Sequence, residues 1–360
     1  PIQGKGVVNR ASRKKLLAIG NLKQPVHAWG EIYTGISAKD YMDGTSNFYG
    51  VHSVTLYVDS VQVFNSTTDK VLPDENRMIN GFTDYEELTR TRRLIMRSYK
   101  LPGNRLRLLH TNENRGAVTI DEERDYHFRY VLEDNFGNRR TYQFIVKGKR
   151  QDIPEYKPEA NEMLYWNRTN VIQKPGMELV VPRYYVYEDV PLRTDMRGDS
   201  SHIAFDYILD AGRTPIHSYC DLSIGLRHMP VTDTTKYYIV QKAGKWRSSM
   251  GGKYANGWIK TRVRSLGTFS VDVDTIAPQI TPIGQGGWRT SRNIRFRIKD
   301  MESGIGSYKV YIDGKFVLFG LKKGILVIQD PEKVKKGVPH KLEVTVTDQC
   351  GNMTRKEYKF

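Results

Sequence analysis

The sequence predicts a mainly all-β protein built from tandem Ig-like β-sandwich modules, with one short helix inserted in the first module. Three observations predict this fold: strands that alternate apolar and polar residues, turn-forming pairs between them, and an internal repeat near both ends of the chain. The 360 residues exceed what one core usually organises, about 250 residues. We therefore expect modules at 1–148, 161–273 and 274–360, with a linker at 149–160.

Each copy of the repeat begins with a predicted β-hairpin. Apolar and polar side chains alternate over residues 53–64, around the pair Asp59-Ser60, and again over 307–319, around Asp313-Gly314. Such pairs tolerate the positive φ angles of a two-residue turn. The pattern is typical of half-buried strands joined by tight turns.

Each copy continues with a strand that ends in Asp-x-x-Gly-Asn, at residues 134–138 in the first module and 348–352 in the last. Gly137 and Gly351 are suited to the left-handed conformation of a turn, and an aromatic strand follows each. Two modules of one sandwich type, with early strands paired to late strands, explain this repeat.

The middle module is also predicted to be a sheet domain. Its expected strands are residues 177–182, 184–187, 236–240 and 268–273, all rich in β-branched and aromatic side chains.

One helix is predicted in the first module, beginning with a capping box formed by Thr83 and Glu86. Acidic residues occupy its first turn and arginines follow up to Arg97, an order that suits the helix dipole. We expect the helix to cover one open end of the sandwich; a phosphate-binding role for the arginines is the alternative.

The chain is strongly basic, with 56 Lys and Arg against 40 Asp and Glu and a net charge of +16. Such a field attracts nucleic acid, anionic lipid and acidic wall polymers alike. The basic residues are dispersed, so the charge predicts no specific nucleic-acid partner. Polyanion binding should be electrostatic, weakly specific and weakened by salt, whereas an aromatic stacking site would survive salt.

The cysteines, the apolar runs and the N-terminus indicate which disulfides, membrane spans and signal peptides the sequence predicts. Only Cys220 and Cys350 are present, far apart in sequence, so no disulfide framework is predicted and their redox state stays open. No apolar run reaches the roughly 18 residues of a transmembrane helix. The N-terminus Pro1-Ile2-Gln3 has no Met and no signal-peptide pattern, which indicates a processed chain or a piece of a longer one.

No catalytic constellation is visible in the sequence. None of the eight histidines has a metal-ligand spacing, and there is no serine elbow, phosphate loop or dinucleotide fingerprint, so we expect no catalytic residue and no zinc in this chain. The acidic residues Asp300, Glu302 and Asp348, with Asp272 and Asp274 close by at a module boundary, are weak candidates for calcium. Turns at strand ends are the alternative explanation.

Aromatic residues in a turn-rich stretch are the candidates for ligand binding. Trp246, Tyr254 and Trp258 are flanked by Gly, Ser and Asn, as in a loop that stacks on sugars. Packing within a core or loop is the alternative.

Parts of the sequence resemble a known family. The segments 1–9, 39–51, 114–116 and 126–130 are similar to the region downstream of the catalytic domain in Bacteroidetes-type murein peptidases of the lysostaphin or LytM type, metallopeptidase family twenty-three. The last module more generally resembles bacterial Ig-like domains, through Asp274-Thr275-Ile276-Ala277-Pro278 and residues 300–305.

The resemblance implies zinc-dependent cleavage of peptidoglycan by a His and Asp pair plus His-x-His, neither of which occurs here. Zinc is then expected only in a catalytic domain upstream of Pro1, in a parent protein of the periplasm or the outer-membrane-associated cell envelope. The leading hypothesis is a non-catalytic accessory region that positions such a cell-wall peptidase on peptidoglycan, another envelope polymer or a protein. A glycan-binding or adhesin-like envelope protein unrelated to a peptidase is the alternative, and the oligomeric state stays open.

Overall fold

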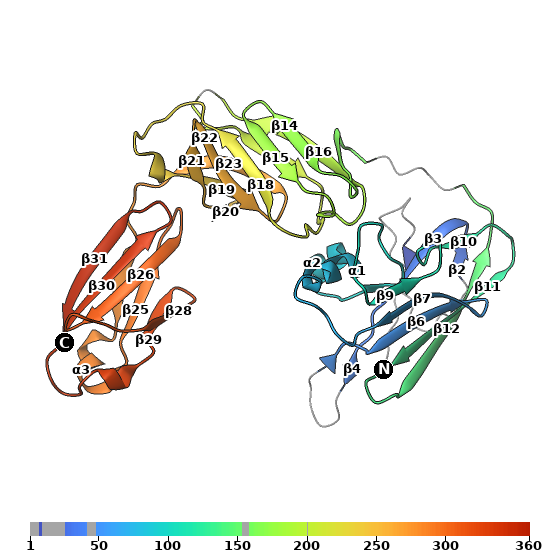
Figure 1. The fold of residues 1–360 in the computed structure, drawn as a ribbon, viewed down its shortest axis with the longest axis horizontal. Coiled ribbons are helices and arrows are strands. Elements are labelled where there is room, and N and C mark those ends of the chain that lie inside the picture. The colour runs from blue at the N-terminus through green and yellow to red at the C-terminus, as the bar shows by residue number, and fades with distance from the viewer. Residues whose placement is uncertain (1–6, 9–25, 42–47, 153–157, 200) are drawn as a thin grey trace. The chain divides into compact units, whose positions relative to one another are not determined.

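The computed structural model describes residues 7–8, 26–41, 48–152, 158–199 and 201–360. Its residues are 48% strand and 8% helix, and the strands form several sheets (Figure 1). The predicted all-β fold of tandem β-sandwich modules is therefore confirmed. Within the described ranges, no helix is both long enough and apolar enough to cross a membrane.

Contacts divide the chain into two compact units. Unit 1 comprises Pro1–Asn170, Val181–Arg193 and Ala211–Tyr219, and unit 2 comprises Val171–Val180, Thr194–Asp210 and Cys220–Phe360. The predicted boundaries of three modules and a linker at 149–160 stay a prediction. Residues 153–157 of that linker lie outside the described residues.

The first sheet of unit 1 has six strands, in the order β2-β12-β11-β6-β7-β9. Along the chain these are β2 (Val26–Ala28), β6 (Ser53–Val58), β7 (Val61–Thr67), β9 (Leu109–Thr111), β11 (Asp125–Glu133) and β12 (Arg139–Gly148). A second sheet forms around β3 (Gly30–Ile36), which pairs with β1 (Val7–Val8), β8 (Met96–Arg97) and β10 (Val118–Ile120).

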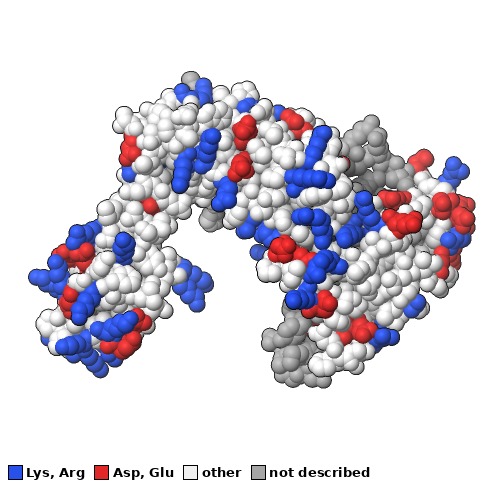
Figure 2. Space-filling model, viewed as in Figure 1, with Lys and Arg blue, Asp and Glu red and all other residues white. Residues whose placement is uncertain are grey.

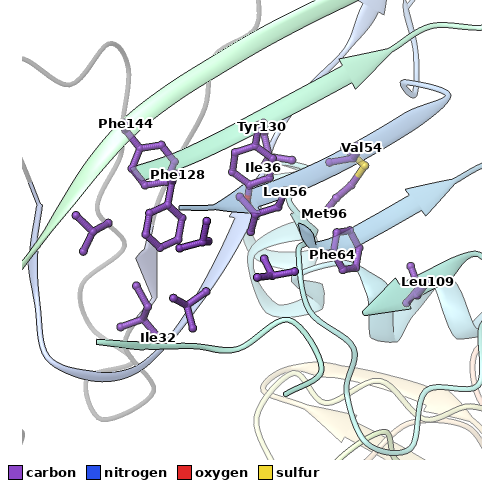
Figure 3. Packing of buried hydrophobic residues seen from close by; sticks show 14 of the residues in the cluster. Ile32, Ile36, Val54, Leu56, Phe64, Met96, Leu109, Phe128, Tyr130 and Phe144 are labelled. Atoms are coloured by element: carbon purple, nitrogen blue, oxygen red, sulfur yellow. The ribbon is translucent and has the colours of Figure 1, made fainter. Parts of the chain in front are cut away.

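The core of unit 1 lies between these sheets (Figure 3). Ile32 and Ile36 of β3 point to the same side of the strand, because buried and less buried residues alternate along it. Both belong to one buried hydrophobic cluster with Leu56 of β6. Phe128 of β11 and Phe144 of β12 pair directly and stack with ring centroids 5.0 Å apart. Alternating strands thus bury one face of each sheet, as the sequence pattern predicts.

Both predicted hairpins are confirmed. β6 and β7 flank Asp59 and Ser60, whose φ angles are 48° and 70°, and β26 (Ile305–Ile312) and β27 (Lys315–Phe316) flank Asp313 and Gly314, at 49° and 76°. The expected long-range pairing is also present. β11 pairs with β6, and β30 (Lys341–Asp348) pairs with β26.

The helical region of unit 1 differs from the prediction. Two short helices form, α1 (Ile79–Phe82) and α2 (Tyr85–Thr91). Thr83 is extended and ends α1, whereas Asp84 caps α2 by accepting a hydrogen bond from the backbone N–H of Glu87. The predicted capping box of Thr83 and Glu86 is therefore wrong by one residue. Arg92 adopts a φ of 64° and ends α2, so Arg97 belongs to β8 rather than to a helix.

Strands from residues 162–273 form two further sheets. One has the order β13-β16-β17-β23-β19-β20 and the other β14-β15-β18-β22-β21. Their bounds are β13 (Glu162–Leu164), β14 (Asn170–Lys174), β15 (Met177–Val181), β16 (Val190–Arg197), β17 (Asp206–Asp210), β18 (Cys220–Gly225), β19 (Tyr237–Ala243), β20 (Trp246–Ser249), β21 (Lys253–Ala255), β22 (Trp258–Val263) and β23 (Gly267–Val273).

The predicted strand at 184–187 is absent from the described structure. Tyr184 has a φ of 66°, which breaks an extended conformation, and Tyr187 is buried in unit 1, where its hydroxyl donates to the carbonyl of Arg77 at 2.7 Å. The tyrosines of this segment serve as packing groups within a turn.

The C-terminal part of unit 2 is a sandwich of two four-stranded sheets. One contains β24 (Gln279–Ile283), β25 (Arg295–Lys299), β29 (Ile325–Ile328) and β28 (Phe319–Lys322), and the other contains β27, β26, β30 and β31 (Met353–Lys359). Trp288 of the short helix α3 (Trp288–Ser291) is fully buried between them, 5.0 Å from the Phe296 ring. Cys220 and Cys350 are both buried and form no disulfide.

Candidate functional site

Trp258, the first residue of β22, lies on the outer face of the five-stranded sheet of unit 2. It pairs with Ala255 of β21 on one side and with Gly225 of β18 on the other. A Cβ atom at Gly225 would lie 3.6 Å from Cε2 of the indole, so the ring covers the glycine backbone. Trp258 is half-buried in this position. The small neighbours Gly225 and Ala255 leave part of the indole exposed on this face.

Two lysines lie on the same face as Trp258. Lys253 and Lys260 are directly opposite each other in β21 and β22, and side chains two residues apart on a strand point to the same side, which places both beside the indole. Both are exposed, and no described residue forms an ion pair with either ammonium group. We call Trp258, Lys253 and Lys260 the Trp258 platform.

The Lys253 and Lys260 pair is unusual because like charges directly opposite on neighbouring strands are destabilising. A comparable pair in the other sheet, Lys242 and Arg247, is neutralised by carboxylates. Lys242 binds Asp206 at 2.6 Å, and Arg247 binds Asp272. The platform therefore carries two positive charges that no ion pair among the described residues neutralises.

The structure does not bring the three predicted aromatic residues together on one loop. Trp246 begins β20 in the other sheet, pairs with Ala243, and is 80% exposed. Tyr254 pairs with Ile259, which is fully buried, so its ring points to the opposite side of β21 from Lys253. The predicted sugar-stacking loop is instead a series of strands, and only Trp258 belongs to the platform.

Lys253 and Lys260 were not among the residues predicted from the sequence. The signal was present in Asn256-Gly257, since an Asn-Gly pair is a strong indicator of a two-residue hairpin turn. Asn256 and Gly257 have φ angles of 49° and 83°, as such a turn requires. A turn at this position fixes the register that places Lys253 opposite Lys260.

A second cluster of charged residues involves three aspartates of unit 2. Carboxylate oxygens of Asp274, Asp300 and Asp348 lie within 4.8 Å of one another, and Asp274 and Asp348 are buried. Glu302, which the sequence favoured, is not in this group; it accepts a hydrogen bond from the Tyr238 hydroxyl at 3.4 Å. Of the predicted calcium candidates Asp300, Glu302 and Asp348, the structure thus brings Asp300 and Asp348 together with Asp274, and the calcium site itself stays a prediction.

The aspartate cluster also organises the surrounding loops. Asp274 accepts from the backbone N–H of Ser303 at 3.0 Å, and Asp300 accepts from that of Gly304 at 2.7 Å. Burial raises the pKa of Asp348, and the charges of Asp274 and Asp300 act in the same direction, against the hydrogen bonds from Asn352. The turn-forming explanation therefore has direct support in the hydrogen bonds, and calcium binding stays a prediction.

The basic and acidic side chains are interspersed over the face shown in Figure 2. On this face of the described residues, neither kind of charge forms one continuous block. Local features such as the Trp258 platform are accordingly more informative than the total charge.

One family model matches part of the chain. A family model described as a Zu5-like domain matches residues 161–274, which include the Trp258 platform. No curated protein matches the chain.

Two solved structures are similar to the chain at low sequence identity. A Ca2+-stabilized adhesin with which an Antarctic bacterium binds ice is 10% identical, with 100% of this chain and 99% of that chain covered and a TM-score of 0.17. The SGBP-B protein of the Bacteroides ovatus mixed-linkage glucan utilization locus, solved with a heptasaccharide, is also 10% identical, with coverage of 94% and 66% and a TM-score of 0.16. Identity and TM-scores at this level assign no function to this chain.

Proposed function

We propose that this chain is a non-catalytic binding region of a cell-envelope protein. It holds its parent protein on an anionic envelope polymer, and peptidoglycan is the polymer that we propose first. The observation that carries the proposal is the unneutralised Lys253 and Lys260 pair beside the Trp258 indole. A polyanion would offset the repulsion between the two ammonium groups, and the indole offers an apolar face on which a sugar ring can stack.

The two kinds of contact have different physical ranges. Attraction between exposed charges extends over about 10 Å at 0.1 M salt and brings an anionic polymer to the basic surface. Stacking on Trp258 acts only at contact and depends on buried apolar area. The platform would therefore combine weakly specific attraction with a defined point of attachment.

The test is a pull-down of the full chain on purified peptidoglycan at low salt. We expect Trp258→Ala, and separately Lys253→Met with Lys260→Met, to reduce the bound fraction, because each removes one of the two contacts. Trp246→Ala is the matched control, since it removes a more exposed indole from the other sheet. If Trp258→Ala bound as much peptidoglycan as the unmodified chain, the proposed site would be wrong.

The finer proposal is that the parent protein is a murein metallopeptidase and that this chain is its accessory region. Its support is the resemblance of segments in the first 150 residues, of which 1–6, 9 and 42–47 lie outside the described residues. The chain alone should then show no chelator-sensitive cleavage of peptidoglycan. Reading the coding sequence upstream of Pro1 for a His-x-His domain tests the parentage directly.

A glycan-binding or adhesin-like envelope protein without any peptidase is the second candidate. The Trp258 platform favours it equally, because the platform requires only an anionic glycan and no enzyme. Absence of a zinc motif upstream would favour this candidate. For both, we propose a location in the periplasm or on the outer membrane, and cell fractionation with an antibody to the chain tests it.

A further inference from the structure

A groove of about 280 Å³ opens on the surface of unit 1, far along the chain from the Trp258 platform. This volume is at the lower limit of small-molecule sites, which measure about 300–1,000 Å³, and it suits a single ring-sized ligand. Its lining combines aromatic, cationic, carboxylate and amide groups: Glu31, Tyr33, Tyr99, Lys100, Leu101, Pro102, Glu113, Asn114 and Arg115.

Two tyrosines form the aromatic part of the groove. Tyr33 lies on β3 and Tyr99 follows β8, and their ring centroids are 4.6 Å apart with an interplanar angle of 56°. The Tyr33 hydroxyl donates to the Glu31 carboxylate. Rings fixed in this way offer an apolar surface with polar edges, which matches the C–H face and hydroxyl rim of a sugar.

Lys100 is the only half-buried cation that lines the groove among the described residues. No described residue accepts a hydrogen bond from its ammonium group, although the carboxylates of Glu31 and Glu113 also line the groove, and burial lowers the pKa of Lys100. A charge in this state gains from an anionic partner. A ligand carboxylate is the simplest such partner in a groove that is otherwise suited to a sugar.

The backbone around the groove is held in a fixed conformation. The N–H of Lys100 donates to the carbonyl of Arg115 at 2.9 Å, and Arg115 has a φ of 54°, which is costly for a residue other than glycine. Gly116 follows at a φ of 83°, and a Cβ there would lie 2.6 Å from the carbonyl oxygen of Ser98. The loop is therefore held against the segment that follows β8 and carries Tyr99, which reduces the entropy lost on binding.

We propose that this groove binds a single pyranose residue that carries a carboxylate. The carboxylate pairs with Lys100, the sugar ring packs on Tyr33 and Tyr99, and the hydroxyl groups bond to the exposed side chains of Glu113 and Asn114. This goes beyond the proposed function because the groove and the Trp258 platform lie in different units and bind independently.

The experiment measures the affinity of the full chain for two matched pairs of sugars by calorimetry or ligand-observed NMR. N-acetylmuramic acid and N-acetylglucosamine differ by a lactyl carboxylate, and glucuronic acid and glucose differ by oxidation of one carbon. We expect the acidic member of at least one pair to bind about tenfold or more tightly than its neutral partner, as a hydrogen-bonded charge contact predicts.

The variant Lys100→Met keeps the aliphatic stem and should remove this preference while leaving residual binding of the neutral sugar. Lys149→Met, an exposed lysine of the same unit, is the control and should keep the preference. A preference for N-acetylmuramic acid alone identifies wall glycan as the source, and one for glucuronic acid alone identifies a uronic-acid polysaccharide.

Equal affinity of the acidic and neutral sugars, no measurable binding of any of them, or an unchanged preference in Lys100→Met would each overturn the proposal. Peptidoglycan binding by the Trp258 platform is scored separately with Trp258→Ala. A negative result for sugar binding in the groove is thus distinguishable from a negative result for peptidoglycan binding by the Trp258 platform.

Discussion

The turns Asp134–Asn138 and Asp348–Asn352 have the same local structure in different surroundings. In both, the aspartate Oδ1 accepts hydrogen bonds from the backbone N–H groups two and four residues later, at 2.8 and 2.9 Å in the first turn and 2.9 and 2.8 Å in the second. The asparagine amide donates to the aspartate Oδ2 at 2.7 Å in both. The five-residue motif alone therefore determines the turn.

The surroundings differ at the third position of each turn. Phe136 is 91% exposed, whereas Cys350 is 3% exposed and packs with Tyr238 and Val240. The Lys236 ammonium donates to the Cys350 carbonyl at 3.0 Å. The first turn is free of such contacts among the described residues, and the second is part of a packed junction within unit 2.

This difference reverses the electrostatics of the two aspartates. The hydrogen bond from Asn138 holds the pKa of Asp134 below its usual value. Burial raises the pKa of Asp348 even though Asn352 donates an equivalent bond. The motif thus fixes the geometry of the turn, while burial and neighbouring carboxylates decide how the same aspartate affects stability.

The largest expected effect comes from a charge placed at the third position. Cys350→Asp buries a carboxylate near three others, so we expect unit 2 to lose about 3–5 kcal/mol of unfolding free energy. Phe136→Asp leaves the new charge in water and should change stability by no more than about 0.5 kcal/mol. Urea unfolding of both variants measures the difference. Equal losses would show that the two turns are equally buried.

The second-largest expected effect is the gain in unfolding free energy on calcium binding, which should depend on Asp348 and not on Asp134. If the ion binds Asp274, Asp300 and Asp348, a concentration a hundredfold above Kd should stabilise unit 2 by about 2.7 kcal/mol. Asp348→Asn should abolish the gain and Asp134→Asn should keep it. The measurement is the midpoint of thermal unfolding with calcium, with magnesium as the control ion. An unchanged midpoint with calcium would leave the aspartates with their turn-forming role only.

A smaller effect is expected in the dependence of stability on pH. The folded pKa of Asp348 is raised, so the folded state binds more protons and unfolding free energy falls as pH rises through that pKa. The folded pKa of Asp134 is lowered, so its contribution is present above the unfolded pKa and is lost as pH falls through the folded pKa.

Asp348→Asn should therefore weaken the loss of stability on raising the pH, and Asp134→Asn should weaken the loss on acidification. Each variant disturbs the equivalent hydrogen bond between the asparagine amide and the aspartate of its own turn, so each serves as the control for the other. Urea titrations between about pH 3 and pH 7 span the usual aspartate pKa of about 3.9 and measure both slopes. Slopes that change in the same direction in both variants would contradict the opposite pKa shifts.

The hairpins and both Asp-x-x-Gly-Asn turns were predictable from sequence because their hydrogen bonds join residues only a few positions apart. The aspartate cluster was only partly predictable, since Asp274, Asp300 and Asp348 meet through the fold of three separate segments. Thr83 has the side chain of a helix N-cap, but it follows the last residue of α1, and its backbone is extended there.

The Trp258 platform shows the same limit. The Gly, Ser and Asn around Trp246 and Trp258 have the composition of a loop, yet the segment forms strands in two sheets. Asn256-Gly257 indicates the hairpin locally. The contact of the indole with Gly225 depends on β18, more than thirty positions away, and no local pattern predicts it.

The central claim is that Trp258 and the Lys253 and Lys260 pair hold the chain on an anionic glycan. The most direct measurement is the affinity of the full chain for soluble peptidoglycan fragments as salt rises from about 0.1 to 1 M, where the Debye length falls from about 10 to 3 Å. We predict that the lysine double variant flattens the salt dependence and that Trp258→Ala lowers affinity by a similar factor at every salt concentration. Affinities and salt dependence identical to the unmodified chain in both variants would contradict the account.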